Sequence, residues 1–324
     1  MDLRSSAPRV VAGLALLVLG CLIAALYVPY LDNPLIFDDR AFFRGYRFAD
    51  YATSPFALEP RRFAHFTIAA TQVLWGSLEA HRSVSLALHA ACVFALLWTL
   101  RLLRVDFLPA FVASAFFALH PAAVYASAYL VQRTMLLATL FSLLSLGLFV
   151  LGLRRERYAA AVAAAAAYWL AVLSKEHSIL LPAAALCVTP LVTSHWRFAA
   201  RFATLYAVCC APAAVAVFLM RAALVGETYE PALGTIARQI DAVAAGYPAG
   251  SAWAASVLLQ AGLFFRYLAV WMWPALGGMA IDMPLDLSAG WSSWRGGAAL
   301  AAFGAAGAAT LAMVLRARGA LALA

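Results

Sequence analysis

Two adjacent carboxylates, Asp38 and Asp39, stand in the stretch NPLIFDDRAFF, directly after the first long apolar run, and Arg40 follows them at once. Ionised groups are costly close to hydrocarbon, so a paired acid at this point is either a solvated loop or a site. Such a pair can provide a general base, because each negative charge keeps the other basic, or it can hold a divalent cation. We expect Asp38 to be the base, and Asp39 to point elsewhere or to bind a metal or Arg40.

Several basic side chains are candidates to hold a phosphate group. They are Arg133, Lys175 and either Arg62 or Arg266. Arginine offers a planar, two-point fit to phosphate oxygens. The ordinary alternatives are that Arg133 snorkels to lipid headgroups, and that Lys175 and Glu176 form a solvated turn pair.

The remaining polar side chains fall at the ends of apolar runs, in separate connections that reach one depth on one side. We expect them to line the same polar cavity: Arg40, His65, His89, His120, Gln132 and Glu176. For His120, which precedes Pro121, a helix cap is the alternative. The convergence of these connections on a loop with two carboxylates favours a site.

The composition indicates what positions these residues. The chain is 65% hydrophobic and 12% charged, with a mean hydropathy of +0.87, a balance that would expose too much apolar surface on a soluble globule. The apolar runs are continuous and show no alternation of period two, which favours helices over a barrel. We therefore expect an all-α polytopic membrane protein.

About eight runs are predicted to cross the bilayer as helices, each needing about 20 residues or a little fewer. They are Val10 to Tyr30, Val84 to Leu100, Phe107 to Leu119, Thr134 to Leu153, Tyr158 to Ser174, Ser178 to Ser194, Phe202 to Val225 and Gly297 to Leu315. The third is short and is expected to continue through His120 and Pro121 toward Ala126. A further stretch, Ala252 to Ile281, is expected to be re-entrant or interfacial.

The basic residues set the orientation. With the N-terminus inside, the short inner loops hold eleven bases and three acids, a surplus that equals the formal net charge of +8. The outer side then has two large loops, 31–83 and 226–295, and Phe63 to Trp75 in the first is expected to lie along the membrane surface. We expect an inner (cytoplasmic) membrane protein with its active face outward. The basic charge is thus a topology signal and does not indicate nucleic acid.

The sequence has no P-loop and no Gly-rich dinucleotide turn, so nucleotide chemistry is not supported, and it also has no HExxH and no CxxC arrangement. An activated group at an outer face would most simply arrive on a lipid carrier.

Four segments, in order, carry a resemblance to a known class: FDD after the first run, RRFAHFTIAATQVLWGSLEAHRSVSLALH, LHPAAVYASAYLVQRTMLLATLF and LAVLSKEHSILLP. They resemble the GT-C class of membrane glycosyltransferases, and most closely the bacterial relatives of the transmembrane O-mannosyltransferases with tetratricopeptide repeats, although no such repeats follow here. The resemblance implies transfer of a sugar from a polyprenyl-phosphate donor at the outer leaflet. It also implies that Asp38 is the catalytic base.

The sequence interpretation is therefore a single GT-C-like transmembrane domain over residues 1–324. It would transfer the sugar to a protein, lipid or glycan acceptor. The cofactor stays open, with a divalent cation at Asp38 and Asp39 as one option. The alternatives are a transporter or flippase of a lipid-linked glycan, for which internal repeats would be expected, and a non-catalytic scaffold subunit.

Overall fold

The computed structural model describes residues 3–45, 48–226, 251–274 and 294–323. Within these ranges the chain forms helices and no strands, which confirms the all-α prediction. The chain divides into two compact units, residues 1–220 and 221–324. That the whole chain is one GT-C-like domain stays a prediction.

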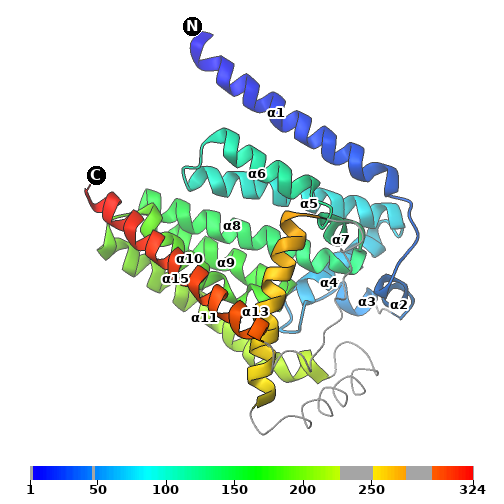
Figure 1. The fold of residues 1–324 in the computed structure, drawn as a ribbon. Coiled ribbons are helices and arrows are strands. Elements are labelled where there is room, and N and C mark those ends of the chain that lie inside the picture. Colours follow the sequence, from blue (N-terminus) through cyan, green and yellow to red (C-terminus); the bar gives the residue numbers. More distant parts are fainter. Residues whose placement is uncertain (1–2, 46–47, 227–250, 275–293, 324) are drawn as a thin grey trace. The chain divides into compact units, whose positions relative to one another are not determined.

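Figure 1 shows the helices in chain order. Their bounds are α1 Leu3–Tyr27, η1 Val28–Tyr30, α2 Asp38–Gly45, α3 Phe48–Tyr51, α4 Arg62–Leu74, α5 Leu78–Leu102, α6 Phe107–Leu119, α7 Ala123–Ala128, η2 Leu130–Gln132, α8 Arg133–Arg155, α9 Ala159–Ser174, η3 Glu176–Leu180, α10 Leu181–Val192, α11 Trp196–Gly226, α13 Ser251–Met272 and α15 Trp294–Leu323.

In the described part of the chain, five helical stretches are long and apolar enough to cross a membrane. They are Val10–Tyr30, Leu78–Leu102, Leu130–Arg155, Trp196–Leu219 and Trp294–Met313. Each coincides with one of the predicted runs. Together they make this a helical integral membrane protein.

The other three predicted runs form shorter helices. α6, α9 and α10 have 13, 16 and 12 residues. At 1.5 Å per residue these are roughly 20, 24 and 18 Å long, shorter than a hydrocarbon core of about 30 Å. Eight crossings therefore stay a prediction. So does the path of the stretch 252–281, of which α13 covers most and residues 275–281 lie outside the described part.

One expectation about the third run was wrong. The helix does not continue through His120 and Pro121, because α6 ends at Leu119 and His120 is extended, with φ −65° and ψ 132°. A proline disfavours helical geometry in the residue before it. The chain restarts as the separate short helix α7.

The core of the first unit is built mainly by α8, α9 and α11. Phe149, Tyr168, Phe202 and Tyr206 are fully or almost fully buried there. Ser145 of α8 donates to the carbonyl of Ala164 at 2.7 Å, and its Oγ lies 3.0 Å from the hydroxyl of Tyr206. Polar groups in the middle of these helices are thus paired inside the protein.

A second cluster joins α1 to α5 and α6. Leu19, Ile23 and Tyr27 of α1 pack on Val93 and Ala118. The first helix is therefore held against the bundle along one side.

Close packing joins α5 to α8. A Cβ at Gly147 would overlap the ring of Trp98, so only glycine allows this approach.

Polar contacts gather at both ends of α8. At its start, Arg133 donates to the backbone carbonyl of His81 at 2.8 Å. Beyond its other end, His195 Nδ1 lies 2.6 Å from Glu156 Oε1. The end at which α8 begins is the one where the predicted site residues lie.

Candidate functional site

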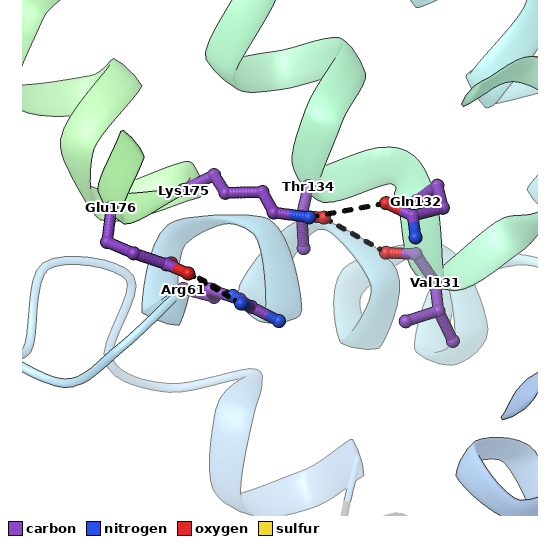
Figure 2. Close-up of polar contacts among 6 residues, drawn as sticks. All are labelled: Arg61, Val131, Gln132, Thr134, Lys175 and Glu176. Carbon is purple, nitrogen blue, oxygen red and sulfur yellow. Dashed lines mark hydrogen bonds and ion pairs between the residues drawn. The ribbon is translucent and has the colours of Figure 1, made fainter. Parts of the chain in front are cut away.

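The turn Tyr129–Gln132 is the centre of this polar end. It follows α7 and leads into α8, with Tyr129 in an extended conformation and Leu130–Gln132 as a 3₁₀ turn. Thr134 Oγ1 donates to the carbonyl of Val131 at 3.2 Å and steadies the turn from the first residues of α8 (Figure 2). Two separate parts of the chain, α2 and the end of α9, meet this turn, and the Arg61–Glu176 pair lies next to the second of them in the sequence.

Asp39 meets it from α2. Its carboxylate is completely buried and accepts the backbone N–H groups of Leu130 at 3.0 Å and Val131 at 2.9 Å, one on each oxygen. Burial raises the pKa of Asp39, while these two hydrogen bonds and the nearby Arg82 oppose that rise. Asp39 thus closes the amino end of a helical turn, as a capping carboxylate does.

Asp38 lies in the opposite environment. Its side chain is exposed, and its backbone N–H donates to the hydroxyl of Tyr129 at 3.2 Å. Phe37, directly before it, has φ +47° and packs edge-on against the ring of Tyr129. Asp38 is therefore the more exposed member of the pair, because the turn that buries a carboxylate here packs against Asp39.

The acidic pair does not offer two unpaired carboxylates to a cation, because both oxygens of Asp39 accept hydrogen bonds from backbone N–H groups. In the described residues no group of three His, Cys, Asp or Glu side chains could hold a metal. Arg40 does not pair with Asp39 as one option had it, and its Nε donates to the carbonyl of Leu35 at 2.9 Å. The donor set does not fit the divalent cation considered above.

Lys175 meets the turn from the end of α9. Its Nζ donates to Gln132 Oε1 at 3.4 Å, and no carboxylate forms an ion pair with it in the described part of the chain (Figure 2). Burial and the nearby Arg61 lower the pKa of Lys175, and Glu176 partly opposes this. It is the only lysine in the chain.

Arg61 and Glu176 form the third part of the site. Arg61 Nε donates to Glu176 Oε2 at 3.0 Å and Nη2 to Oε1 at 2.6 Å, a two-point ion pair (Figure 2). Both side chains are partly exposed, at 17% and 29%. Glu176 follows Lys175 directly, so the pair lies next to the lysine.

Arg133 turns into the protein instead. It is fully buried, and its five N–H groups point at neutral acceptors of α4 and α5: Thr67 O at 3.0 Å, Thr71 Oγ1 at 2.8 Å, His81 O at 2.8 Å, His81 Nδ1 at 3.3 Å and Ser85 Oγ at 3.4 Å. This conformation leaves none for a phosphate. We therefore replace its predicted phosphate role with one of fastening three helices.

Arg62 is also used structurally. It donates to the carbonyls of Asp50 and Ser54, both at 2.7 Å, and pairs with Glu59 at 3.0 Å. Its guanidinium carbon also lies 4.5 Å from the centre of the Tyr51 ring. Arg62 thus ties the loop before α4 to that helix, and it is not placed to serve as the predicted phosphate ligand.

The three predicted cavity histidines are buried in separate places. His65 lies between the rings of Phe42 and Tyr51, and burial together with Arg61 and Arg62 lowers its pKa to about 4. His89 Nε2 lies 3.0 Å from the carbonyl of Ala118, which joins α5 to α6. His120 Nδ1 accepts the N–H of Ala122 at 3.1 Å, in the turn just before α7. None of the three is brought into the cluster of Lys175.

Arg266 lies on α13 in the second unit, where it is exposed. The site built from the first unit does not include it. The predicted residues that the structure brings to the turn are Asp38, Asp39 and Lys175, and Gln132 belongs to the turn itself, whereas Glu176 follows Lys175 and pairs with Arg61.

Two residues that the sequence interpretation missed contribute to the site, Arg61 and Tyr129. The sequence did contain a signal for Arg61. Arg62 lies at helical spacing from His65 and Ala69 on the buried face of α4, so Arg61 is the arginine of the two that is left to face another partner. No comparable signal marked Tyr129, whose partner Asp38 is 91 residues away.

No protein-family model, no curated protein and no solved structure matches this chain.

Proposed function

We propose that this protein is a membrane glycosyltransferase that moves a sugar from a polyprenyl-phosphate carrier to an acceptor hydroxyl. The observation that carries the proposal is that one turn, Tyr129–Gln132, contacts both the acidic pair and Lys175. Glycosyl transfer with a phosphate leaving group requires a base and a cation, and here both groups contact the same short turn.

Asp38 supplies the base in this proposal. Asp38 is exposed, whereas the buried Asp39 next to it holds the turn in place. Asp38 takes the proton of the acceptor hydroxyl while that oxygen bonds to the anomeric carbon of the sugar. The bond from that carbon to the phosphate oxygen breaks, and the phosphate leaves on its lipid.

Lys175 supplies the cation. Its only described hydrogen bond goes to a neutral amide oxygen, at 3.4 Å, so two of its three N–H groups are available to phosphate oxygens. Its position at the end of a helix that packs within a membrane bundle suits a phosphate at the lipid surface.

Lysine-specific chemistry tests the binding half of the proposal. Because Lys175 is the only lysine, an amine-reactive reagent modifies one side chain and the chain's α-amino group, which mass spectrometry of the peptides separates. A polyprenyl phosphate should protect Lys175 and leave the α-amino group reactive. Equal labelling with and without the lipid would contradict the proposal.

The transfer half is tested by incubating the purified protein with a panel of polyprenyl-phosphate sugars and acceptors. Lys175→Gln, which keeps the side chain polar and removes the charge, should raise KM for the donor and lower kcat. If the lipid protects Lys175 but the protein only moves it between the leaflets of a vesicle, the flippase alternative is supported. If the lipid neither protects Lys175 nor is moved, the scaffold alternative is supported.

A further inference from the structure

The guanidinium of Arg61 is held in the geometry that recognises oxyanions. Its Nε and Nη2 each meet one oxygen of Glu176, at 3.0 and 2.6 Å. Two oxygens of a phosphate present the same fork-on-fork arrangement. Figure 2 shows the pair beside the side chain of Lys175.

Arg61 is also presented by an unusual backbone. It has φ +58° and ψ 20°, the left-handed region that non-glycine residues rarely adopt, at the residue before α4 begins. The conformation separates Arg61 from Arg62: the first faces Glu176, and the second is buried against the loop 50–59.

Glu176 reaches Arg61 from the segment that carries Lys175. Arg61 and Glu176 both act electrostatically on Lys175, so a phosphate held by Lys175 would lie close to this pair. Both side chains are partly exposed, so water screens part of the attraction between them. A ligand with up to two negative charges can compete with it.

We propose that Arg61 is a second phosphate-binding residue, and that Glu176 occupies it only until a phosphate arrives. The phosphate is anchored by Lys175, takes the guanidinium from Glu176, and the freed carboxylate turns to solvent. The inference rests on the proposed function in that a phosphate-bearing ligand binds at Lys175. It adds a residue and an exchange of partners.

The experiment measures the ligand concentration that half-protects Lys175 from an amine-reactive reagent, on the full chain in detergent micelles. The probes are a short-chain polyprenyl phosphate and, in a separate arm, inorganic phosphate. Glu176→Gln weakens the competitor, so the polyprenyl phosphate should bind about tenfold more tightly, within the usual range for coupled sites. Glu176→Asp, which keeps the charge, should lie between this variant and the wild type.

A matched control separates exchange from a simple change of charge. Glu59→Gln removes the same charge two residues before Arg61, but from a carboxylate that pairs with Arg62. It should change the affinity less than twofold. In the background of Arg61→Gln, the gain from Glu176→Gln should disappear, because the guanidinium that would be released is absent.

Each result decides the inference. A gain for the polyprenyl phosphate alone supports it and assigns the ligand to a lipid, and a gain in both arms supports it and assigns the site to phosphate itself. Protection by the polyprenyl phosphate with no gain in Glu176→Gln, or a gain that persists without Arg61, overturns the exchange and leaves the proposed function standing. No protection in any variant overturns both.

Discussion

Asp38 and Asp39 are neighbours in the chain but lie in different environments: Asp38 is exposed, and the carboxylate of Asp39 is buried against the N–H groups of Leu130 and Val131. Chemical and structural roles are therefore divided between two adjacent acids. The division makes their substitutions distinguishable by different measurements.

Asp38→Asn should abolish sugar transfer while leaving the fold and the protection of Lys175 intact. The amide keeps the shape of the side chain but cannot take a proton, and a general base is typically worth about 10²- to 10⁴-fold in rate. Initial rates of transfer, with the unfolding temperature measured in the same detergent, check this. A variant with near wild-type rate would show that Asp38 is not the base.

Asp39→Asn should instead destabilise the protein. An asparagine can accept one of the two backbone N–H groups and points its own N–H₂ at the other, which leaves a buried donor unsatisfied at a cost of about 1–3 kcal/mol. The unfolding temperature should fall, with Asp38→Asn as the matched control. If the two variants unfold together, Asp39 does not hold the turn.

Arg133→Lys should be poorly tolerated although the charge is kept. An ammonium has three N–H groups for the five acceptors that Arg133 now satisfies, and each buried polar group left without a partner costs about 1–3 kcal/mol. Arg155→Lys, at the exposed far end of the same helix, should stay within about 0.5 kcal/mol of the wild type. Equal losses in both variants would contradict the fastening role.

His65 should make stability fall in acid. The folded protein keeps this ring neutral down to about pH 4, whereas the unfolded chain protonates it near pH 6.5. The unfolded state therefore binds the extra proton, and stability present above pH 6.5 is lost as the pH falls toward 4, by about 3 kcal/mol at 1.36 kcal/mol per pKa unit. Unfolding of wild type and His65→Gln at pH 7 and pH 4 checks this, since the glutamine should remove this part of the slope. An unchanged slope would rule His65 out as its source.

Gly147→Ala should loosen the contact between α5 and α8. The added methyl group would overlap the ring of Trp98, and overpacking of this kind costs about 1–3 kcal/mol. Gly304→Ala on α15 is the control, because nothing lies within 4 Å of the corresponding position. The unfolding temperature should fall only for the first variant, and an equal response would contradict the close approach.

The sequence alone predicted the helical membrane architecture and the end of the bundle where polar groups meet. Long apolar runs form helices in a bilayer because a helix pairs every backbone N–H and C=O group within one segment. The convergence of Asp39, Gln132, Lys175 and Glu176 followed from which ends of the runs shared a side. The end of α6 was also predictable from Pro121, although the prediction extended it.

The assignment of roles within that end could not be predicted from the sequence. Arg133 and Arg61 carry the same charge, and each lies at the start of a helix. Arg133 is nevertheless enclosed by five acceptors, whereas Arg61 pairs with Glu176. Which arginine is enclosed depends on the neutral groups of α4 and α5 that come within reach after packing. A sequence pattern shows where a cation lies along a helix, but it does not show which partners surround it.

The hydrogen bonds from Leu130 and Val131 to Asp39 join positions 91 and 92 residues apart. At synthesis rates of about 5–20 residues per second, roughly 5–18 s pass between the synthesis of Asp39 and that of its two partners. During that interval the first polar segment has no turn to close on, and its carboxylate stays hydrated. This end of the protein is therefore assembled only after α4, α5, α6 and α7 have been made, and truncation before residue 130 would leave it unfinished.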